Sequence, residues 1–175
     1  MTLPSSHLFD HPAAIPAERL LADCDIRFVR RSGPGGQHRN KVATAVVLHH
    51  RPSGVVAEAS ERRSQAENRA VAIRRLRINL ALQLRTDRDP AAASSSLWRS
   101  RCDGGRLTVS AAHDDFPTLL AEALDVLTAF GFDTRPAAEL LGCTASQLVK
   151  FLQKEPRAMV LVNEKRTASG LRPLL

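Results

Sequence analysis

Hydrophobic residues change their spacing at Ser64, and this change constrains the fold more than any other feature of the sequence. Residues 42–59 alternate between apolar and polar side chains, as strands with one buried face do, and a Pro-Ser-Gly turn interrupts them at 52–54. From Ser64 to Leu84, apolar residues recur at steps of three and four, which predicts an amphipathic helix. The central part of the chain therefore predicts a hairpin followed by a long helix.

Two further patterns place this hairpin in a small antiparallel sheet packed by the helix. Residues 26–30 predict one more strand, which can pair with the strands at 42–49 and 55–59. Ser64 and Glu67 have the spacing of a capping box, which predicts the helix start. The apolar face of the helix consists of Ala66, Ala70, Ile73, Leu76, Leu80 and Leu84. The opposite face carries Arg69, Arg74, Arg75 and Arg77. We expect one side of the helix to cover the sheet and the other to face an anion.

The C-terminal half predicts a small all-helical domain. Helices are expected after Asp115, where Pro117 follows at a favourable position, and from Thr134. Thr144 and Gln147 form a second capping box, which predicts a further helix. The fold class is therefore expected to be α+β, with a sheet and its long helix followed by a helical domain.

Composition divides the sequence into four segments. The first is polar, contains proline and ends in a predicted short helix at 17–22, and the second holds the sheet and the long helix. The third is rich in Ala, Ser, Asp and Gly without clear periodicity, so we expect a linker with Trp98 as its anchor. The fourth is the helical domain. In order, these segments are residues 1–25, 26–88, 89–112 and 113–175.

The positive charge of the protein is concentrated in one segment. The chain has a net charge of +7 and a pI near 10.3, and residues 27–88 carry 14 Lys or Arg against four acidic residues. Nearly all of these bases are arginine, whose guanidinium group forks onto phosphates. Tyr is absent and aromatic residues are scarce, so few platforms exist for stacking single-stranded bases. We expect structured RNA, contacted through its backbone, as the partner; scattered surface charge for solubility is the alternative.

The sequence predicts a cytoplasmic protein that crosses no membrane. Its first residues show no cationic start followed by an apolar run, and no apolar segment reaches the roughly 18 residues that a membrane span needs. Cys24, Cys102 and Cys143 lie far apart and form no C-x-x-C pair, which is typical of proteins from a reducing compartment.

The segment from Arg31 to Lys41 has a composition that ordinary folding does not explain. It reads Arg-Ser-Gly-Pro-Gly-Gly-Gln-His-Arg-Asn-Lys. Its glycines open backbone torsions that are closed to other residues and permit close approach to a partner, while basic residues on both sides supply charge. A flexible hairpin tip is the alternative, because Gly-Gly-Gln by itself is a common sequence.

The residues around this segment extend it into a longer pattern. Arg-x-Ser-Gly-x-Gly-Gly-Gln-x-x-Asn-Lys occupies residues 30–41, His-x-Pro-Ser-Gly-Val follows at 50–55, and Glu-Arg-x-Ser-Gln-x-x-Asn-Arg follows at 61–69. The amphipathic helix comes next. In this order the chain resembles the class I peptide chain release factor family. It looks most like the short, codon-independent peptidyl-tRNA hydrolases that rescue stalled ribosomes.

The resemblance implies hydrolysis of the peptidyl-tRNA ester in the peptidyl-transferase centre of the ribosome, with Gly35, Gly36 and Gln37 at the point of chemistry. In the family, the backbone N–H of the residue at Gln37 stabilises the carbonyl oxygen as it gains negative charge, which lowers the barrier by roughly 3 kcal/mol. The Gln37 side chain shapes the water pocket, and a Cβ at either glycine would collide with RNA or forbid the required torsions. No metal, cofactor or Ser-His-Asp triad is implied.

Several polar residues near the segment are candidates for contact with ribosomal RNA. His38 is expected to be a polar residue that contacts RNA, with a general base as the alternative, and His49 and His50 are expected to be strand-end residues rather than a zinc site. A solvated surface is the alternative for the whole set. The candidate RNA-binding residues are Arg31, Ser32, His38, Asn40, Lys41, Arg62, Arg69, Arg74, Arg75 and Arg77.

The chain departs from its presumed relatives at both ends. Residues 1–25 leave no room before the first strand for domains that read a stop codon, so we expect codon-independent release. Short rescue hydrolases end in a strongly basic tail. Residues 157–175 instead contain four bases and one acid, so the feature that senses a stalled ribosome is not evident.

The helical domain suggests what replaces these parts. Residues 138–150 have the cadence of a helix-turn-helix, but the second helix offers only Lys150 and Lys154, so DNA binding is not expected. We expect this domain to dock on the ribosome or on a partner protein. Two functions remain: a peptidyl-tRNA hydrolase of ribosome rescue, or a non-hydrolytic ribosome- or RNA-binding protein whose helical domain recruits a partner.

Overall fold

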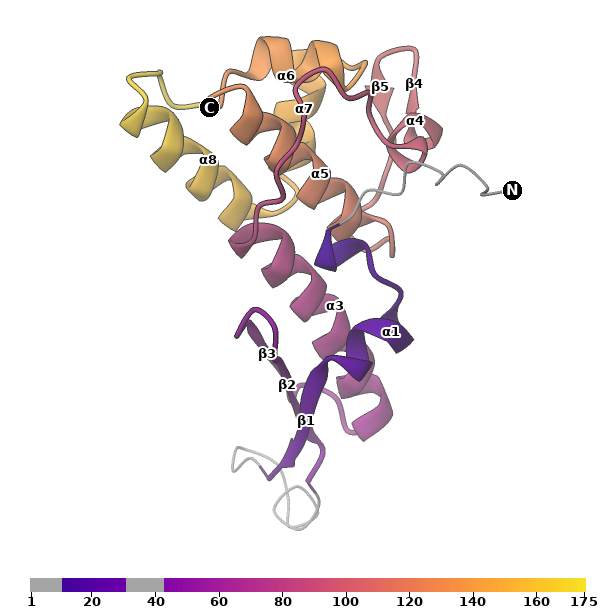
Figure 1. Ribbon diagram of the computed structural model, residues 1–175. Coiled ribbons are helices and arrows are strands. Elements are labelled where there is room, and N and C mark those ends of the chain that lie inside the picture. The colour runs from indigo at the N-terminus through magenta and orange to yellow at the C-terminus, as the bar shows by residue number, and fades with distance from the viewer. Residues whose placement is uncertain (1–10, 31–42) are drawn as a thin grey trace, which may run out of the picture.

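A three-stranded antiparallel sheet forms one end of the molecule (Figure 1). The computed structural model describes residues 11–30 and 43–175. The sheet consists, in spatial order, of β1 (Cys24–Val29), β2 (Ala45–His50) and β3 (Val56–Ala59). Val46 and Leu48 of the central strand are fully buried, in agreement with the alternation of the sequence. The predicted small antiparallel sheet is therefore confirmed.

Helix α3 (Gln65–Gln83) lies between the sheet and helix α5 (Phe116–Ala129), and it contacts both (Figure 1). The Ser64 side chain accepts a hydrogen bond from the N–H of Glu67 at 3.4 Å, which confirms the predicted helix start. The buried residues of α3 are Asn68, Ala72, Leu76, Ile78, Leu80 and Ala81. Ala66 and Ala70 are exposed, so their predicted place on the apolar face was wrong. Because α3 is covered from two sides, a single apolar stripe does not describe it.

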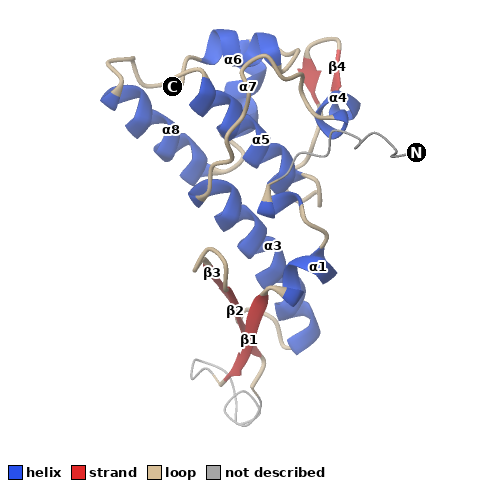
Figure 2. Ribbon diagram, in the orientation of Figure 1, coloured by secondary structure: helices blue, strands red, loops and turns tan. Residues whose placement is uncertain are grey.

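From Phe116 to Ala168 all regular elements are helices, as Figure 2 shows. Helix α5 is buried at every position from Phe116 to Leu127, because α3, α6 (Thr134–Leu140) and the short helix η1 (Pro12–Ala14) all lie against it. The side chain of Thr144 accepts a hydrogen bond from the N–H of Gln147 at 3.2 Å, as its predicted cap requires. No described helix combines the length and apolar composition needed to cross a membrane. Outside residues 89–112, the remaining described helices are α1 (Ala17–Ala22), α7 (Ala145–Leu152) and α8 (Pro156–Ala168).

Residues 89–112, for which the sequence predicts a linker, contain short regular elements. They are α4 (Ser96–Arg101), β4 (Cys102–Asp103) and β5 (Arg106–Leu107). Trp98 is fully buried, and its indole N–H donates a hydrogen bond of 2.7 Å to the carbonyl oxygen of Leu141. Its ring meets that of Phe151 edge to face, with 5.7 Å between the ring centres. Trp98 therefore anchors this segment on the helical domain, while the four-way division of the chain stays a prediction.

Two buried carboxylates of α5 fasten the chain that follows α3. Glu122 accepts hydrogen bonds from the backbone N–H and the hydroxyl of Ser95, at 2.6 and 2.5 Å. Asp125 forms an ion pair of 3.1 Å with Arg85. A buried carboxylate is tolerated only when such partners replace its water. The two acids thus hold residues 85–95 against the helical core.

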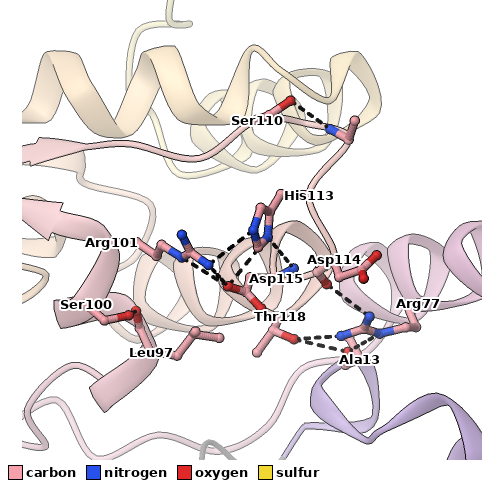
Figure 3. A network of polar contacts seen from close by, with 11 residues as sticks. Ala13, Arg77, Leu97, Ser100, Arg101, Ser110, His113, Asp114, Asp115 and Thr118 are labelled. Atoms are coloured by element: carbon pink, nitrogen blue, oxygen red, sulfur yellow. Dashed lines mark hydrogen bonds and ion pairs between the residues drawn. The ribbon is translucent and has the colours of Figure 1, made fainter.

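Arg77 connects α3 to two other parts of the protein (Figure 3). Its Nε donates to the carbonyl oxygen of Ala13 in η1 at 2.9 Å, and its Nη1 donates to the carbonyl oxygen of Asp114 at 3.0 Å. Its Nη2 donates to the hydroxyl oxygen of Thr118 in α5 at 3.0 Å. Burial lowers the pKa of this guanidinium, but the group stays charged at neutral pH. One side chain therefore links the sheet-bearing half to the helical half.

Replacing Arg77 by Ala is expected to lower the free energy of unfolding by about 2 kcal/mol, because three charge-assisted hydrogen bonds, two of them to the buried residues Ala13 and Thr118, are lost together. Arg77→Lys should recover only part of this loss, since an ammonium group cannot span all three acceptors. Urea denaturation followed by circular dichroism measures the change. Arg106→Ala is the matched control, because Arg106 is exposed and its side chain has no hydrogen-bond partner among the described residues. Equal stability of Arg77→Ala and Arg106→Ala would contradict the proposed link.

Candidate functional site

The residues predicted to carry the chemistry lie outside the part of the chain that the structure describes. They are Arg31, Ser32, Gly35, Gly36, Gln37, His38, Asn40 and Lys41. The described residues on either side of this segment belong to paired strands, because Val29 at the end of β1 pairs with Ala45 at the start of β2. The structure therefore gives the frame to which the glycine-rich segment is attached, and the roles of its residues stay predictions.

The first turn of α3 is tied to the residues that lead into β2. Asn68 is fully buried, and its Nδ2 donates hydrogen bonds to the carbonyl oxygens of Thr44 at 2.8 Å and Arg62 at 2.9 Å. Its Oδ1 accepts a hydrogen bond of 2.9 Å from the backbone N–H of Arg62. Nε2 of Gln65 donates to the carbonyl oxygen of Ala43 at 3.1 Å. The helix therefore holds the chain where the described residues resume after the glycine-rich segment.

Neither Gln65 nor Asn68 is among the predicted site residues, although both lie in the pattern at 61–69 and the spacing of the helix carries a further signal for Asn68. Asn68 precedes Ala72 and Leu76 at steps of four, so it lies on the face of α3 that those residues bury. A buried amide is costly unless its hydrogen bonds are satisfied. A polar residue in line with an apolar stripe therefore indicates a specific hydrogen-bond partner. Here the partners are the backbone groups of Thr44, just before β2, and of Arg62, after β3.

Exposed arginines occur at the end of β1 and around the start of α3. They are Arg27, Arg30, Arg62, Arg63 and Arg69. None of their side chains forms a hydrogen bond or ion pair with another residue in the described ranges. Arg62 and Arg69 belong to the predicted RNA-binding set. The other three do not, although their place beside the motif residues was visible in the sequence. Together these side chains give the sheet end a positive surface.

The other predicted arginines of α3 bind within the protein. Arg74 donates a hydrogen bond to the carbonyl oxygen of Ala111, and Arg77 makes the three contacts described above. Arg75 forms an ion pair with Glu61, with 2.7 Å between Nη2 and Oε1. Hydrogen bonds from backbone N–H groups, first that of Glu61 itself, and the charge of Arg75 lower the pKa of the Glu61 carboxyl. Contact of these three arginines with RNA stays a prediction. Of the predicted members that the structure describes, Arg62 and Arg69 have guanidinium groups without a partner in the described ranges.

The His-x-Pro-Ser-Gly-Val sequence at 50–55 forms the turn between β2 and β3. The N–H of His50 donates to the carbonyl oxygen of Val55 at 2.9 Å, and the N–H of Gly54 donates to that of His50 at 2.8 Å. Gly54 has a φ of 71°, which favours glycine. The Nδ1 of His50 is hydrogen-bonded to the hydroxyl of Ser53 at 2.6 Å. This part of the pattern therefore sets the pairing of β2 with β3. In the described ranges, no three His, Cys, Asp or Glu residues are grouped so that they could hold a metal.

Protein stability is expected to fall as the pH is lowered below about 6.5, the ordinary pKa of histidine. Burial lowers the pKa values of His50 and His11 in the folded state, so the unfolded chain binds protons more readily. The contribution of these two histidines to the free energy of unfolding is complete above that pH. It is lost as the pH falls toward their folded pKa values. Chemical denaturation between pH 5 and pH 8 measures this slope.

His50→Asn is expected to reduce the slope, because the amide can keep a hydrogen bond to Ser53 without titrating. His11 supplies the part of the slope that remains. Val160→Ala is the control, since this side chain is exposed and carries no titratable group. If His50→Asn and the wild type lose stability equally over this pH range, burial of His50 does not cause the effect.

The comparisons with known proteins agree with this frame. The RF-1 domain family matches residues 18–106, which is slightly more than half of the chain and spans the sheet, α3 and the glycine-rich segment. Peptide chain release factor 1 of Enterococcus faecalis is 44% identical over 78 residues, which are 43% of this chain and 22% of that protein. The same factor of Acidiphilium cryptum is 48% identical over 64 residues, 37% of this chain and 18% of its own. The chain thus matches about a fifth of the length of these curated relatives. Because the family match covers more than half of it, the chain belongs to the class I peptide chain release factor family, whose RF-1 domain it carries.

Proposed function

We propose that this protein hydrolyses the ester bond between nascent peptide and tRNA in the peptidyl-transferase centre of the ribosome. The observation that carries the proposal is the RF-1 domain match over residues 18–106, which contains the sequence Gly35-Gly36-Gln37 within its longer pattern. The two relatives compared above are named peptide chain release factors. We propose that the whole protein acts on ribosomes in the cytoplasm.

The proposed reaction is attack of water on the ester carbonyl carbon. The carbon–oxygen bond to the tRNA ribose breaks, the peptide leaves as a carboxylic acid, and the ribose recovers its hydroxyl. The carbonyl oxygen gains negative charge on the way. A backbone N–H at Gln37, fixed toward that oxygen, would lower the barrier by roughly 3 kcal/mol. The side chain of Gln37 would shape the space for the attacking water, and Gly35 and Gly36 would allow the close approach.

Large-subunit RNA is the proposed partner of the sheet end. The exposed guanidinium groups of Arg62 and Arg69, with those of Arg27, Arg30 and Arg63, can each neutralise a phosphate. Such contacts release counterions, so ribosome binding should weaken as salt rises. The location of these side chains at the end of the sheet that bears Gly35 to Gln37 supports this assignment, because binding there would bring the motif to RNA.

We propose further that this protein releases peptides without reading a stop codon. The ester hydrolysis is assigned to residues within the RF-1 domain match alone, and the chain matches only about a fifth of the release factors compared above. We propose that the residues assigned to the reaction need no contact with a codon. The helical half, from α5 to α8, lies beyond the matched residues and is proposed to dock on the ribosome or on a partner protein.

The deciding experiment adds purified protein to ribosomes that hold a labelled peptidyl-tRNA and measures release of the peptide. One set of ribosomes is stalled on a messenger without a stop codon, and a matched set has a stop codon in the decoding site. We expect wild-type protein to release peptide from the first set at least as fast as from the second, and Gln37→Ala to be slow on both.

Other results would redirect the proposal. Release confined to stop-codon ribosomes would overturn codon independence while leaving ester hydrolysis intact. Equal release by wild type, Gln37→Ala and a protein-free control would remove the hydrolase function. Salt-sensitive binding to ribosomes without release would then favour a non-hydrolytic ribosome-binding protein.

A further inference from the structure

We infer that Asn68 and Gln65 are positioning residues, which fix the direction in which the glycine-rich segment joins β2. This inference rests on the proposed function and deepens it. Both side chains belong to the first turns of α3, and both donate hydrogen bonds to consecutive backbone carbonyl groups, those of Thr44 and Ala43. Only Val42 separates Ala43 from Lys41, the last residue of the motif. The two bonds therefore act on the chain just after the end of the motif, six residues beyond Gln37 in the case of Ala43.

The geometry at Asn68 favours a precise role over general packing. The side chain is fully buried and satisfies both Nδ2 hydrogens and its Oδ1 with backbone groups. A buried amide with every partner in place has a single orientation, because any other leaves a polar group unpaired. Thr44 is thereby held at one position relative to the α3 axis. The distances of 2.8 and 2.9 Å are those of well-formed bonds.

Asn68 also holds a charged residue of the same end. The backbone N–H and carbonyl of Arg62 are both bonded to the Asn68 amide, at 2.9 Å each, so this amide closes a ring with the Arg62 backbone. The Arg62 side chain is exposed and is a proposed phosphate contact. One buried amide thus sets the spacing between the point where the motif joins the sheet and a cation that binds RNA. Binding of that cation would then place the motif at a fixed distance.

The opposite side of the segment is fixed by the sheet itself. Val29 pairs with Ala45 in the antiparallel ladder, so β1 and β2 are already in register there. The ladder ends at this pair, and Thr44 and Ala43 lie just beyond it. Without Gln65 and Asn68, these two residues would have no described hydrogen bond to set their direction. We call the hydrogen bonds from Gln65 and Asn68 to Ala43 and Thr44 the clamp. The clamp fixes the chain beyond the last strand pair, toward the motif.

Loss of the clamp should change the rate of peptide release in the bound complex more than it changes binding to the ribosome. Displacement of a reacting group by about 1 Å can lower a rate by about 100-fold while leaving the contacts that hold the partner in place. Loss of the clamp is therefore expected to lower kcat for peptide release. The KM for ribosomes, which depends on the arginines, should stay within about twofold.

The test compares Gln65→Ala, Asn68→Ala and Asn79→Ala with the wild type. Gln65 is exposed, so its substitution is expected to leave the melting temperature unchanged and separates positioning from folding. Asn79 is the matched control, because it is also an asparagine of α3 that donates to a strand carbonyl, that of Val56 at 2.9 Å. Val56 lies at the other end of the sheet, at the start of β3. We expect kcat to fall about tenfold in Gln65→Ala and more in Asn68→Ala, with Asn79→Ala unaffected.

Amide hydrogen exchange at residues 43–46 gives a readout that does not depend on activity. Faster exchange in Gln65→Ala and Asn68→Ala than in Asn79→Ala and the wild type shows the clamp. Faster exchange with unchanged kcat would overturn the positioning role, and so would a fall in kcat shared by Asn79→Ala. If the wild type releases no peptide, the proposed function fails by itself, and equal exchange in all four proteins would then overturn the clamp as well.

Discussion

Gly36→Ala is expected to lower kcat for peptide release by about 100-fold or more, because it withdraws the donor that the proposed mechanism places at Gln37. A loss of this size matches removal of one fixed hydrogen bond to the developing oxyanion. The substitution adds a single methyl group and changes no charge. In the proposed mechanism its effect would come from the torsions that a Cβ forbids and from collision with RNA, both of which would move the Gln37 N–H. Single-turnover release from stalled ribosomes measures the change.

Gly170→Ala provides the control for this prediction. Gly170 has a φ of 75° with open space around it, so alanine there strains the backbone at the end of α8 without touching the sheet. We expect a small loss of stability and an unchanged release rate. Gln37→Ala adds a second comparison, because it keeps the backbone N–H and removes only the side chain. If Gly36→Ala releases peptide as fast as Gly170→Ala, the main-chain donor is not the origin of catalysis.

The elements that the sequence predicts well are those fixed by local chemistry. Ser64 caps α3 and Thr144 caps α7 in the structure, because a cap needs only a side-chain oxygen and a free N–H within the same turn. The turn at 50–55 follows from proline, serine and glycine in the same way. The helix at 17–22 is also present as predicted. Each of these signals acts over a few residues, so it does not depend on the rest of the fold.

The parts that the sequence did not predict depend on distant contacts. Ala66 and Ala70 continue an apolar repeat but are exposed, because sheet and α5 cover α3 on sides that a repeat within one helix cannot show. Arg77 looks like a surface cation in sequence, yet its partners come from η1 and from residues 114 and 118. Contacts across 37 to 64 residues leave no trace in local spacing.

The candidate site divides along the same line. Gly35, Gly36 and Gln37 are identified by a long ordered pattern, whose chemistry needs no knowledge of the fold. Gln65 and Asn68 lie in that pattern too, but their action is on Ala43 and Thr44, more than 20 residues earlier. The motif thus identifies residues that belong to the site. The structure shows that some of them bond to the backbone that holds the glycine-rich segment. The clamp at the base of the segment is one such assignment.

Trp98→Ala is expected to lower the free energy of unfolding by about 3–5 kcal/mol, the largest effect on stability anticipated for this chain. Trp98 is fully buried, and truncation removes the edge-to-face contact with Phe151 of α7. It also leaves the carbonyl of Leu141 without the indole N–H. Trp98→Phe should lose less, because it retains much of the ring and forfeits mainly the hydrogen bond.

The chain contains no other tryptophan, so unfolding of these variants must be followed by circular dichroism in urea and not by fluorescence. Val160→Ala is the control, since this side chain is 58% exposed and should change stability by less than about 0.5 kcal/mol. A loss of under about 1 kcal/mol in Trp98→Ala would mean that residues 89–112 contribute little to the free energy of unfolding, as expected of a linker. The expected larger loss would instead make this segment part of the core that joins α3 to the C-terminal helices, so that the sheet and the helical half unfold together.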